Sequence, residues 1–301
     1  MSLEFRDIFA NEPIIPAKEM AAYEALWEND KASFKSLAEL FQNNPGILPS
    51  QIVDNEDIIN DAYQRVISYF DKANVNDFHF AFKGTIDFPA KLDDAKNPLQ
   101  FYYYRGNPDL VFSKKSVAVV GTRSPSEEGI RRTRQLVRDL VKHDFTIFSG
   151  LASGIDKIAH ESALEFEGRT VAVLGTPLTE YYPKENKELQ DIIAQDHLLI
   201  SQVPVLKYKK QTYKINRFFF PERNATMSAL SDATIIVEAG ETSGTLTQAK
   251  HALYQGRKLF ILNNCFENPA ISWPAKFERE GAIRVRTFED ILKGLEGLSN
   301  E

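Results

Sequence analysis

From Ser116 onward, short apolar runs rich in β-branched residues alternate with amphipathic stretches of helical length. Such runs are typical of strands that are buried on both faces, and the helical stretches between them supply the crossover connections that parallel strands need. The runs are SVAVV, FTIFS, TVAVL, HLLIS, ATIIVEA, KLFIL and AIRV. The sequence therefore predicts an α/β fold with a doubly wound, mostly parallel sheet from about Ser116 to Val285.

Two further regions precede this alternation. From Glu19 to about Ala73, apolar residues recur at helical spacing, which predicts a small helical domain. From Asn74 to Lys115 the chain is aromatic and broken by prolines, which indicates extended strands and turns that lead into the sheet. We therefore place a helical N-terminal domain at residues 1–78 and the sheet domain at residues 79–301.

Composition and charge limit the classes of function. The chain has 301 residues and a net charge of −6, so any contact with nucleic acid requires a local basic patch. The one cysteine, Cys265, suits a reducing compartment; we interpret it as a small buried hydrophobic residue and expect no metal site. The N-terminus lacks a secretory signal pattern, and no window approaches the roughly 18 apolar residues of a membrane span. We therefore expect a cytoplasmic protein without a membrane partner.

The first predicted strand ends in GTRSPSEEG, a run of small residues with one arginine that opens a helix. Free backbone amides and the helix dipole attract a phosphate at such a position, and a guanidinium can bind it with two hydrogen bonds. We therefore predict an anion site at Gly121, Thr122 and Arg123. The glycine fingerprint of dinucleotide-binding folds is absent from this loop, so we expect no cofactor.

The second predicted strand ends in FSGLASGIDKIAH, which places two glycines and two serines where a strand passes into a helix. Gly150 and Gly154 allow an anion to approach the backbone, so we predict a second phosphate-binding loop that includes Ser149. Asp156 lies near the start of the helix, where a carboxylate suits capping more than catalysis. We expect His160, further along the helix, to be packed rather than chemically active.

The stretch TIIVEAGETSGTLTQAKHA repeats this arrangement later in the chain. Here Ser243, Gly244 and Thr245 follow a strand and open a helix with amides and hydroxyls available to an anion. Ligands on doubly wound sheets bind at the carboxyl ends of the strands, and all three loops fall at such ends. We therefore predict that Gly121, Gly150 and Gly244 lie at one edge of the sheet.

A basic and aromatic segment stands out in a chain that is acidic elsewhere. Between Lys207 and Arg223 lie six basic residues, one acid and five aromatic residues. Basic residues neutralise phosphates with release of counterions, and interleaved rings offer bases a stacking surface worth roughly 1–3 kcal/mol each. The alternative is a flexible surface loop anchored by Phe218, Phe219 and Phe220. The nucleic-acid interpretation assigns phosphate contacts to Lys209, Lys210, Lys214, Arg223 and Asn224, and stacking to Tyr208, Tyr213 and Phe220.

Several motifs follow one another in a characteristic order: VAVVGTRSPS, FSGLASGIDKIAHESAL, TVAVLGTPLTEYYPKEN, LLISQVP, FFFPERNATMSALSDATIIVEA, TSGTLTQAKHALYQGRKLFIL and EGAIRV. In these motifs the chain resembles the DNA-processing protein A (DprA/Smf) family, and the resemblance covers roughly Phe88 to Val285. It implies an extended Rossmann domain, often with a helical N-terminal domain before it. Because the chain ends soon after FEDILKGLEGLSNE, we expect it to lack the C-terminal winged helix of some members.

The resemblance also implies a function. Members of the family are understood to bind single-stranded DNA, to protect it and to load the recombinase RecA onto it during natural transformation, and a homodimer through the Rossmann domain is expected. The chain departs from the family pattern with Ser153 and Ala225 in place of arginines and Gln202 in place of a glutamate. These departures leave DNA binding more dependent on Arg123, Arg223 and the cluster from Lys207 to Lys214.

Two other classes of function fit the same loops. One is a nucleotide-binding or nucleotide-hydrolysing enzyme, because the related cytokinin-riboside phosphoribohydrolases share a loop resembling G-G-x-G-T-x-x-E. In this chain Gln248 stands where that pattern has a carboxylate, and a glutamine can neither act as a general base nor stabilise an oxocarbenium ion by charge. The other is a small-ligand sensor or a defence-associated partner protein. We predict a DNA-binding protein without catalytic residues.

Overall fold

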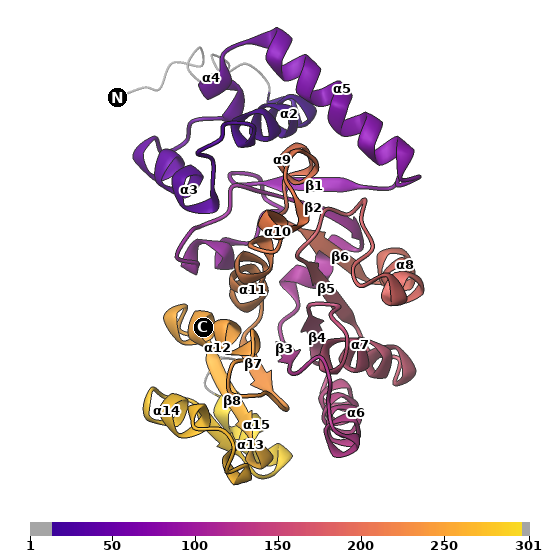
Figure 1. The fold of residues 1–301 in the computed structure, drawn as a ribbon, viewed down its shortest axis with the longest axis vertical. Coiled ribbons are helices and arrows are strands. Elements are labelled where there is room, and N and C mark those ends of the chain that lie inside the picture. Colours follow the sequence, from indigo (N-terminus) through magenta and orange to yellow (C-terminus); the bar gives the residue numbers. More distant parts are fainter. Residues whose placement is uncertain (1–13, 297–301) are drawn as a thin grey trace, which may run out of the picture.

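The computed structural model describes residues 14–296, and within them one sheet of nine strands runs through the molecule (Figure 1). The strands are β1 (His79–Phe82), β2 (Phe101–Gly106), β3 (Ser116–Val120), β4 (Thr146–Ser149), β5 (Thr170–Leu174), β6 (Leu198–Ser201), β7 (Ala233–Ile236), β8 (Lys258–Leu262) and β9 (Ile283–Val285). Their order across the sheet is β1-β2-β6-β5-β4-β3-β7-β8-β9. Each apolar run predicted to be a strand from Ser116 onward forms one.

The strands from β3 to β9 are parallel, while β1 and β2 extend the sheet antiparallel beyond β6. The strand order reverses at β3, whose neighbours are β4 on one side and β7 on the other. In doubly wound sheets the loops at the carboxyl ends on either side of such a reversal open a crevice. The predicted doubly wound, mostly parallel sheet is confirmed, and its reversal marks where a ligand site is expected.

Helices cover both faces of the sheet and also lie over its β1–β2 end (Figure 1). They are α2 (Pro16–Trp27), α3 (Phe34–Asn43), α4 (Pro49–Val53), α5 (Glu56–Lys72), η1 (Ala90–Asp94), η2 (Pro108–Phe112), α6 (Glu127–Lys142), α7 (Ile155–Glu165), η3 (Lys184–Asn186), α8 (Lys187–Asp196), α9 (Val205–Lys210), α10 (Tyr213–Asn216), α11 (Phe219–Leu230), α12 (Thr245–Tyr254), α13 (Asn263–Glu267), α14 (Trp273–Arg279) and α15 (Phe288–Leu295). Polar N-cap side chains at Ser33, Asn55 and Ser126 begin α3, α5 and α6. No helix within residues 14–296 is long and apolar enough to cross a membrane.

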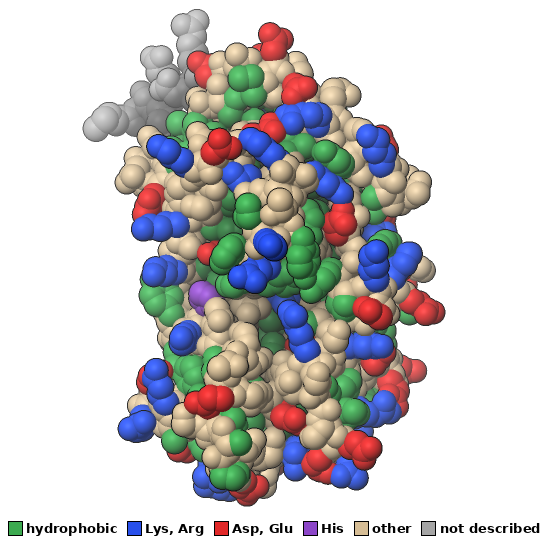
Figure 2. Space-filling view, viewed as in Figure 1, with side chains coloured by type: hydrophobic (Ala, Val, Ile, Leu, Met, Phe, Trp, Pro, Cys, Tyr) green, Lys and Arg blue, Asp and Glu red, His purple; other side chains and the backbone are tan. Residues whose placement is uncertain are grey.

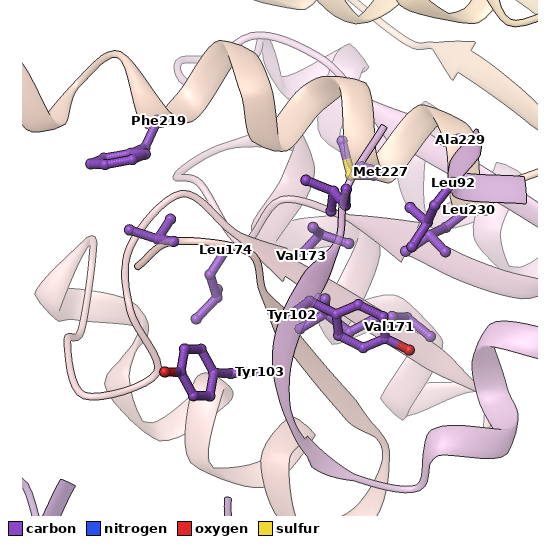
Figure 3. Close-up of a cluster of buried hydrophobic side chains, with 14 of the residues drawn as sticks. Leu92, Tyr102, Tyr103, Val171, Val173, Leu174, Phe219, Met227, Ala229 and Leu230 are labelled. Carbon is purple, nitrogen blue, oxygen red and sulfur yellow. The ribbon is translucent and has the colours of Figure 1, made fainter. Parts of the chain in front are cut away.

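Successive residues of the parallel strands point to opposite faces, so the sheet separates two apolar layers. On one face, Val117 and Val119 pack with residues of α6, α7 and α15. On the other face, Ala118 and Val120 join the larger core, which also includes residues of α11 and α12. Figure 3 shows part of this larger core, where Met227 of α11 lies over β5. Burial on both faces explains why these strands are continuous apolar runs in the sequence.

The N-terminal helices share the larger core with the sheet. Trp27 of α2 and Phe34 of α3 meet edge to face with 4.8 Å between ring centroids, and both rings also approach Phe219 at the start of α11. Tyr23 stacks on Phe101 of β2 at 5.2 Å. The helical arrangement predicted before residue 78 is confirmed within the described residues, while the domain boundary at that position stays a prediction.

A buried carboxylate joins α2 to α9. Glu24 accepts a hydrogen bond from the hydroxyl of Tyr103 (2.6 Å) and two more from the backbone amides of Val205 (2.8 Å) and Leu206 (3.0 Å). Burial raises the pKa of Glu24 to about 7, although these hydrogen bonds favour the ionised form. The first amides of a helix lack partners within the helix, so Glu24 holds α9 by its N-terminus.

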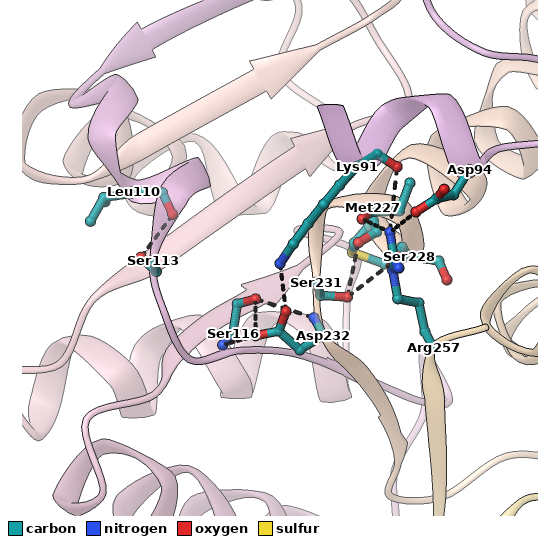
Figure 4. A network of polar contacts seen from close by, with 11 residues as sticks. Lys91, Asp94, Leu110, Ser113, Ser116, Met227, Ser228, Ser231, Asp232 and Arg257 are labelled. Carbon is teal, nitrogen blue, oxygen red and sulfur yellow. Dashed lines mark hydrogen bonds and ion pairs between the residues drawn. The ribbon is translucent and has the colours of Figure 1, made fainter. Parts of the chain in front are cut away.

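A polar network ties the amino ends of β3, β7 and β8 to η1 (Figure 4). Asp232, just before β7, accepts hydrogen bonds from the amide and the hydroxyl of Ser116, each at 2.9 Å, and pairs with Lys91 at 2.5 Å. Arg257, just before β8, pairs with Asp94 at 2.5 Å. These charges lie at the edge of the sheet opposite the glycine loops, so they support the fold and take no part in the candidate site.

Candidate nucleic-acid interface

The crevice at the reversal of strand order contains a cavity of about 470 Å³. Its walls come from the loops that follow β3, β4 and β7 and from α11. Gly121 and Gly244 line the cavity, and Gly150 lies against Arg223, which lines it too. The predicted placement of the three glycine loops at one edge of the sheet is confirmed. We call this space the switch-point cavity and define it by Gly121, Arg123, Asp156, Arg223, Asn224 and Thr245.

The loop after β3 is held on two sides. The amide of Thr122 donates to the carbonyl of Glu238 (2.7 Å), and the carbonyl of Thr122 accepts from the amide of Ile155 (3.1 Å). Gly154 has a φ of +76°, and a Cβ there would lie 2.4 Å from the carbonyl oxygen of Thr122. Gly154 therefore permits the close approach of two loops, and the phosphate contact predicted for it stays a prediction.

The loop after β4 surrounds a carboxylate of its own chain. Asp156 is buried and accepts a hydrogen bond from the amide of Gly150 at 3.2 Å. Burial raises the pKa of Asp156, against the hydrogen bonds from the amides of Ala152 and Gly150. Ser149 is also buried and donates its hydroxyl to the carbonyl of Val119 at 2.7 Å. The carboxylate of Asp156 thus accepts the amide of Gly150, and the phosphate contact predicted for this loop stays a prediction.

Arg223, predicted to contact phosphate, is a buried residue with 5% of its surface exposed. Its Nη1 donates to the carbonyl oxygens of Gly150 (2.5 Å) and Val173 (2.7 Å), at the ends of β4 and β5. Its Nε donates to the side-chain oxygen of Asn224 at 2.9 Å. Burial lowers the pKa of Arg223, opposed by the charge of Asp156. These contacts make Arg223 a structural part of the cavity wall, and the phosphate contact predicted for it stays a prediction.

The loop before α12 opens onto the cavity. A Cβ at Gly244 would meet no atom within 4 Å, so the backbone there is accessible. The amide of Thr245 donates to the hydroxyl of Ser243 (3.2 Å), and the hydroxyl of Thr245 donates to the carbonyl of Gly121 (3.0 Å). The first and third loops are thereby joined. Because α12 begins here, its N-terminus places partial positive charge at the cavity.

Arg123 supplies the exposed positive charge of the cavity. Its side chain lines the cavity, and the structure gives it no ion pair within residues 14–296. The charge of Arg123 acts on Asp156, on Arg223 and on the phenol of Tyr213, which places its guanidinium among these groups. An unpaired guanidinium in this position is available to bind a phosphate with two hydrogen bonds.

Aromatic rings stand beside the cavity. The hydroxyls of Tyr182 and Tyr213 lie 3.2 Å apart, and the ring of Tyr182 lies 5.3 Å from that of Phe220. Tyr213 is 64% exposed, whereas Phe220 packs closely over Gly175. Tyr208 is half-buried, and burial raises its pKa to about 12. Among the predicted stacking residues, Tyr213 presents the most accessible ring, and sequence reasoning missed Tyr182, which stands in the motif TEYYPKEN.

The lysines of α9 face acidic groups rather than the cavity. Lys209 pairs with Glu180, and Lys210 lies 3.2 Å from Asp30. Neither lysine lines the cavity. Lys214 of α10 is exposed and has no ion pair among the residues that the structure describes. The basic segment is therefore partly neutralised by the rest of the chain, which sequence reasoning did not anticipate.

A mixed basic and hydrophobic surface surrounds the middle of one face of the molecule. In Figure 2, Lys and Arg side chains and hydrophobic side chains gather around a central hollow, where Figure 1 places α10 and α11. The segment predicted as basic and aromatic thus folds into short helices at this hollow rather than a flexible loop. This local patch gives an acidic chain a surface suited to a polyanion with exposed rings.

The family model described as DNA recombination-mediator protein A matches residues 79–296 of this chain. The chain belongs to this family. Among its relatives, DNA processing protein DprA of Bacillus subtilis is 31% identical over 231 residues, which cover 77% of this chain and 75% of that protein. The DprA of Streptococcus pneumoniae is 35% identical over 209 residues, with 69% and 71% covered. Protein Smf of Synechocystis is 42% identical over 181 residues, but these make up 44% of its length.

Two solved structures of the DNA recombination-mediator protein A family share this fold. The X-ray structure of DNA processing protein A from Streptococcus pneumoniae has a TM-score of 0.72 and 27% identity, with 94% of this chain and 98% of that chain covered. DNA processing protein A from Helicobacter pylori, described as binding single-stranded DNA, has a TM-score of 0.61 and 29% identity, with 72% and 96% covered. Because 94% of this chain is covered by the Streptococcus pneumoniae structure, the shared region includes most of the N-terminal helices.

The positions at which this family member departs from the predicted pattern have different surroundings. Ser153 is exposed in the loop after β4, and Ala225 is buried in α11. Gln202 is buried, and neither end of its amide has a hydrogen bond within the described residues. Gln248 is also buried, and its amide nitrogen donates to the hydroxyl of Thr234 at 3.2 Å. An uncharged amide therefore stands in the cavity wall where the hydrolase pattern has a carboxylate.

Proposed function

We propose that this chain binds single-stranded DNA at the switch-point cavity and the rings beside it. The observation that supports this most is Arg123, an exposed cation without an ion pair among the described residues, next to the exposed ring of Tyr213. A guanidinium binds a phosphate, and an aromatic face stacks on a base. A strand with unpaired bases supplies both groups side by side, whereas a duplex keeps its bases stacked inside.

The surroundings of the cavity support a polymer rather than a mononucleotide. Lys214 of α10 and Arg217, which follows this helix, are exposed. Basic and hydrophobic side chains gather around the central hollow in Figure 2. A mononucleotide fills one phosphate site and one base site, so it leaves these side chains unused. The Helicobacter pylori relative, described as binding single-stranded DNA, shares the fold over 72% of this chain.

We propose further that the site has no catalytic activity. Asp156 is the one carboxylate among the described residues that line the cavity, and it is hydrogen-bonded to the loop after β4. Glycosidic bond hydrolysis uses a pair of carboxylates on either side of the bond, and Gln248 is uncharged at all pH values. We expect no release of free base from AMP above the background rate, measured by chromatography. Enzymatic release that a change at Arg123 abolishes would support the nucleotide hydrolase instead.

Family membership supports a proposal about the wider role. We propose that the chain protects the bound strand and delivers it to a RecA-type recombinase, as in natural transformation, and that it acts as a homodimer. A nuclease-protection assay and a recombinase filament assay on the same oligonucleotide test the two steps separately. Protection without faster filament formation would limit the role to DNA binding.

Fluorescence anisotropy with a labelled single strand of about 20 bases tests the DNA-binding proposal. We expect affinity to increase with strand length, and AMP or dTMP to compete far less than an unlabelled strand at equal nucleotide concentration. A duplex of the same sequence should bind less tightly than the single strand. If the strand shows no binding at low salt, or if mononucleotides compete equally well, the small-ligand sensor is the better description.

A further inference from the structure

Residues in and just after α10 contribute to two separate places in the molecule. Tyr213 joins the rings beside the switch-point cavity, whereas Ile215 and Phe218 line a second pocket of about 250 Å³. This pocket lies between the N-terminal helices and the segment from α9 to α11. We call it the α10 pocket and define it by Trp27, Phe34, Lys207, Ile215, Phe218 and Phe219.

The α10 pocket has a rigid aromatic floor and an exposed aromatic rim. Trp27, Phe34 and Phe219 form the floor and contact one another edge to face, with centroid separations of 4.8, 6.5 and 6.0 Å. Phe218 is 64% exposed and Ile215 is 47% exposed at the rim. Large apolar side chains that remain exposed beside a pre-formed apolar pocket indicate a surface that binds a ligand. The size and the rings suit a single planar group.

Positive charge surrounds this pocket. Lys35 and Lys207 line it, and the guanidinium of Arg217 lies 5.6 Å from the centre of the Phe218 ring. Glu222 also lines it, and burial raises the pKa of that carboxyl. Lys207 is buried, and its amine donates to the carbonyl of Asn29 at 2.8 Å. A planar group attached to an anion fits this combination of rings and cations.

The α10 pocket and the switch-point cavity are also close enough to share one strand. Tyr213 and Phe218 are five residues apart, and the backbone keeps helical dihedral angles through Arg217 and Phe218. At about 1.5 Å of rise per residue, the Cα atoms of the two residues are roughly 8 Å apart along the helix axis. Nucleotides in a stacked strand are about 3.4 Å apart, so this distance corresponds to two or three nucleotides.

We propose that the α10 pocket receives one base of the single strand whose phosphate is bound at Arg123, with Phe218 as the ring that stacks on it. This inference rests on the proposed function and adds a second base site to it. The N-terminal helices then take part in DNA binding, because Trp27 and Phe34 form the floor of the pocket.

The first test compares Phe218→Ala with Phe112→Ala, a half-exposed phenylalanine in η2 before the amino end of β3. We expect Phe218→Ala to weaken binding of a 20-base strand between about five-fold and one hundred-fold, as stacking energies imply, with no change in the salt dependence. Phe112→Ala should bind like the parent chain. If the two variants bind equally well, the α10 pocket holds no base, while binding by the parent chain would leave the proposed function standing.

The second test uses the fluorescence of Trp27. The chain has two tryptophans, so Trp273→Phe leaves Trp27 as the one reporter in the α10 pocket. We expect the 20-base strand to quench this fluorescence at the concentrations at which anisotropy shows binding, and Phe218→Ala to reduce the quenching. Binding without any change at Trp27 would overturn the inference alone. A change that follows protein concentration and not DNA would overturn it too, in favour of a second copy of the chain.

Discussion

Arg123 and Arg223 both belong to the candidate site, but their surroundings give them opposite roles. Arg223 is buried and donates hydrogen bonds to the carbonyl groups of Gly150 and Val173. Arg123 is exposed and has no ion pair in the part of the chain that the structure describes. A charge that is free in the folded protein can exchange counterions with DNA, whereas a buried charge stabilises its own surroundings. The two arginines therefore allow separate tests of binding and of stability.

Arg123→Ala is expected to weaken binding of single strands of any sequence to a similar degree. Each phosphate neutralised on a single strand contributes about 0.7 to the log–log dependence of affinity on salt, so the variant should lose about that much of the slope. Anisotropy titrations at several salt concentrations measure both quantities. Arg131→Ala is the control, because Arg131 is exposed on α6 and paired with Glu128. An unchanged slope in Arg123→Ala would rule out a phosphate contact there.

Arg223→Met is expected to destabilise the fold. The change removes the positive charge that acts on the buried Asp156 and the donors to two buried carbonyl groups, and each buried polar group left without a partner costs about 1–3 kcal/mol. Urea denaturation measures the free energy of unfolding. Arg217→Met, at an exposed position, should change it by about 0.5 kcal/mol or less. A stable Arg223→Met that has lost DNA binding would instead show that this guanidinium meets phosphate.

Sequence reasoning predicted the loops that form the site more reliably than it predicted which charged side chains there have no ion-pair partner. The motif after β3 indicated Arg123 because a small-residue turn after a strand has a local signature, and the structure places this side chain at the cavity. The pairing of Lys210 with Asp30 and of Lys209 with Glu180 involves residues far apart in the sequence. No local pattern reports such pairs. The phosphate contacts predicted at these lysines therefore stay predictions.

At the scale of elements, α7 meets β5 through a buried histidine. Nδ1 of His160 lies 2.7 Å from the hydroxyl of Thr170, and burial lowers the pKa of His160 to about 3. The prediction that His160 is packed in the helix is confirmed. In the unfolded chain the same ring takes up a proton below about pH 6.5. Between these two pKa values the unfolded state binds one more proton than the folded state does.

Through His160, the free energy of unfolding should therefore decrease as the pH falls from 6.5 towards 3, by an amount on the order of 5 kcal/mol. Urea denaturation across this range should show a shallower pH dependence for His160→Asn than for the parent chain. His79→Asn, at an exposed position in β1, serves as the control. Glu24 acts with the opposite sign between pH 4.5 and about 7, so variants must be compared with the parent chain. Identical pH profiles for His160→Asn and the parent would contradict this assignment.

The strands were more predictable than the short helices around the site. A strand buried on both faces is apolar along its whole length, so runs such as SVAVV and TVAVL indicate strands by themselves. By contrast, α9 begins where Glu24 of the distant helix α2 accepts the amides of Val205 and Leu206. Its boundaries depend on tertiary contacts, which explains why the segment from Lys207 to Arg223 could also be interpreted as a loop.

At the scale of the whole molecule, a chain with a net charge of −6 presents a basic surface around one hollow. Many of the aspartates and glutamates elsewhere form ion pairs with lysines and arginines. The lysines and arginines in these pairs are not available to bind DNA phosphates. Around α10 and the switch-point cavity, Arg123, Lys214 and Arg217 have no ion pair within residues 14–296. Binding should therefore involve few phosphates and depend on salt only moderately.

The salt dependence of the parent chain distinguishes this surface from the larger basic cluster suggested by the sequence. Three phosphate contacts, at Arg123, Lys214 and Arg217, correspond to a slope of about −2 in a plot of log affinity against log salt concentration. The larger cluster suggested by the sequence has five phosphate contacts. These are at Arg123, Lys209, Lys210, Lys214 and Arg223, and they would give a slope of about −3.5. We expect the smaller slope, and we expect Lys209→Ala and Lys210→Ala to leave it unchanged because these lysines are held by Glu180 and Asp30. Anisotropy over a tenfold range of salt measures the slope, and a value near −3.5 that falls in either lysine variant would show that DNA displaces these ion pairs.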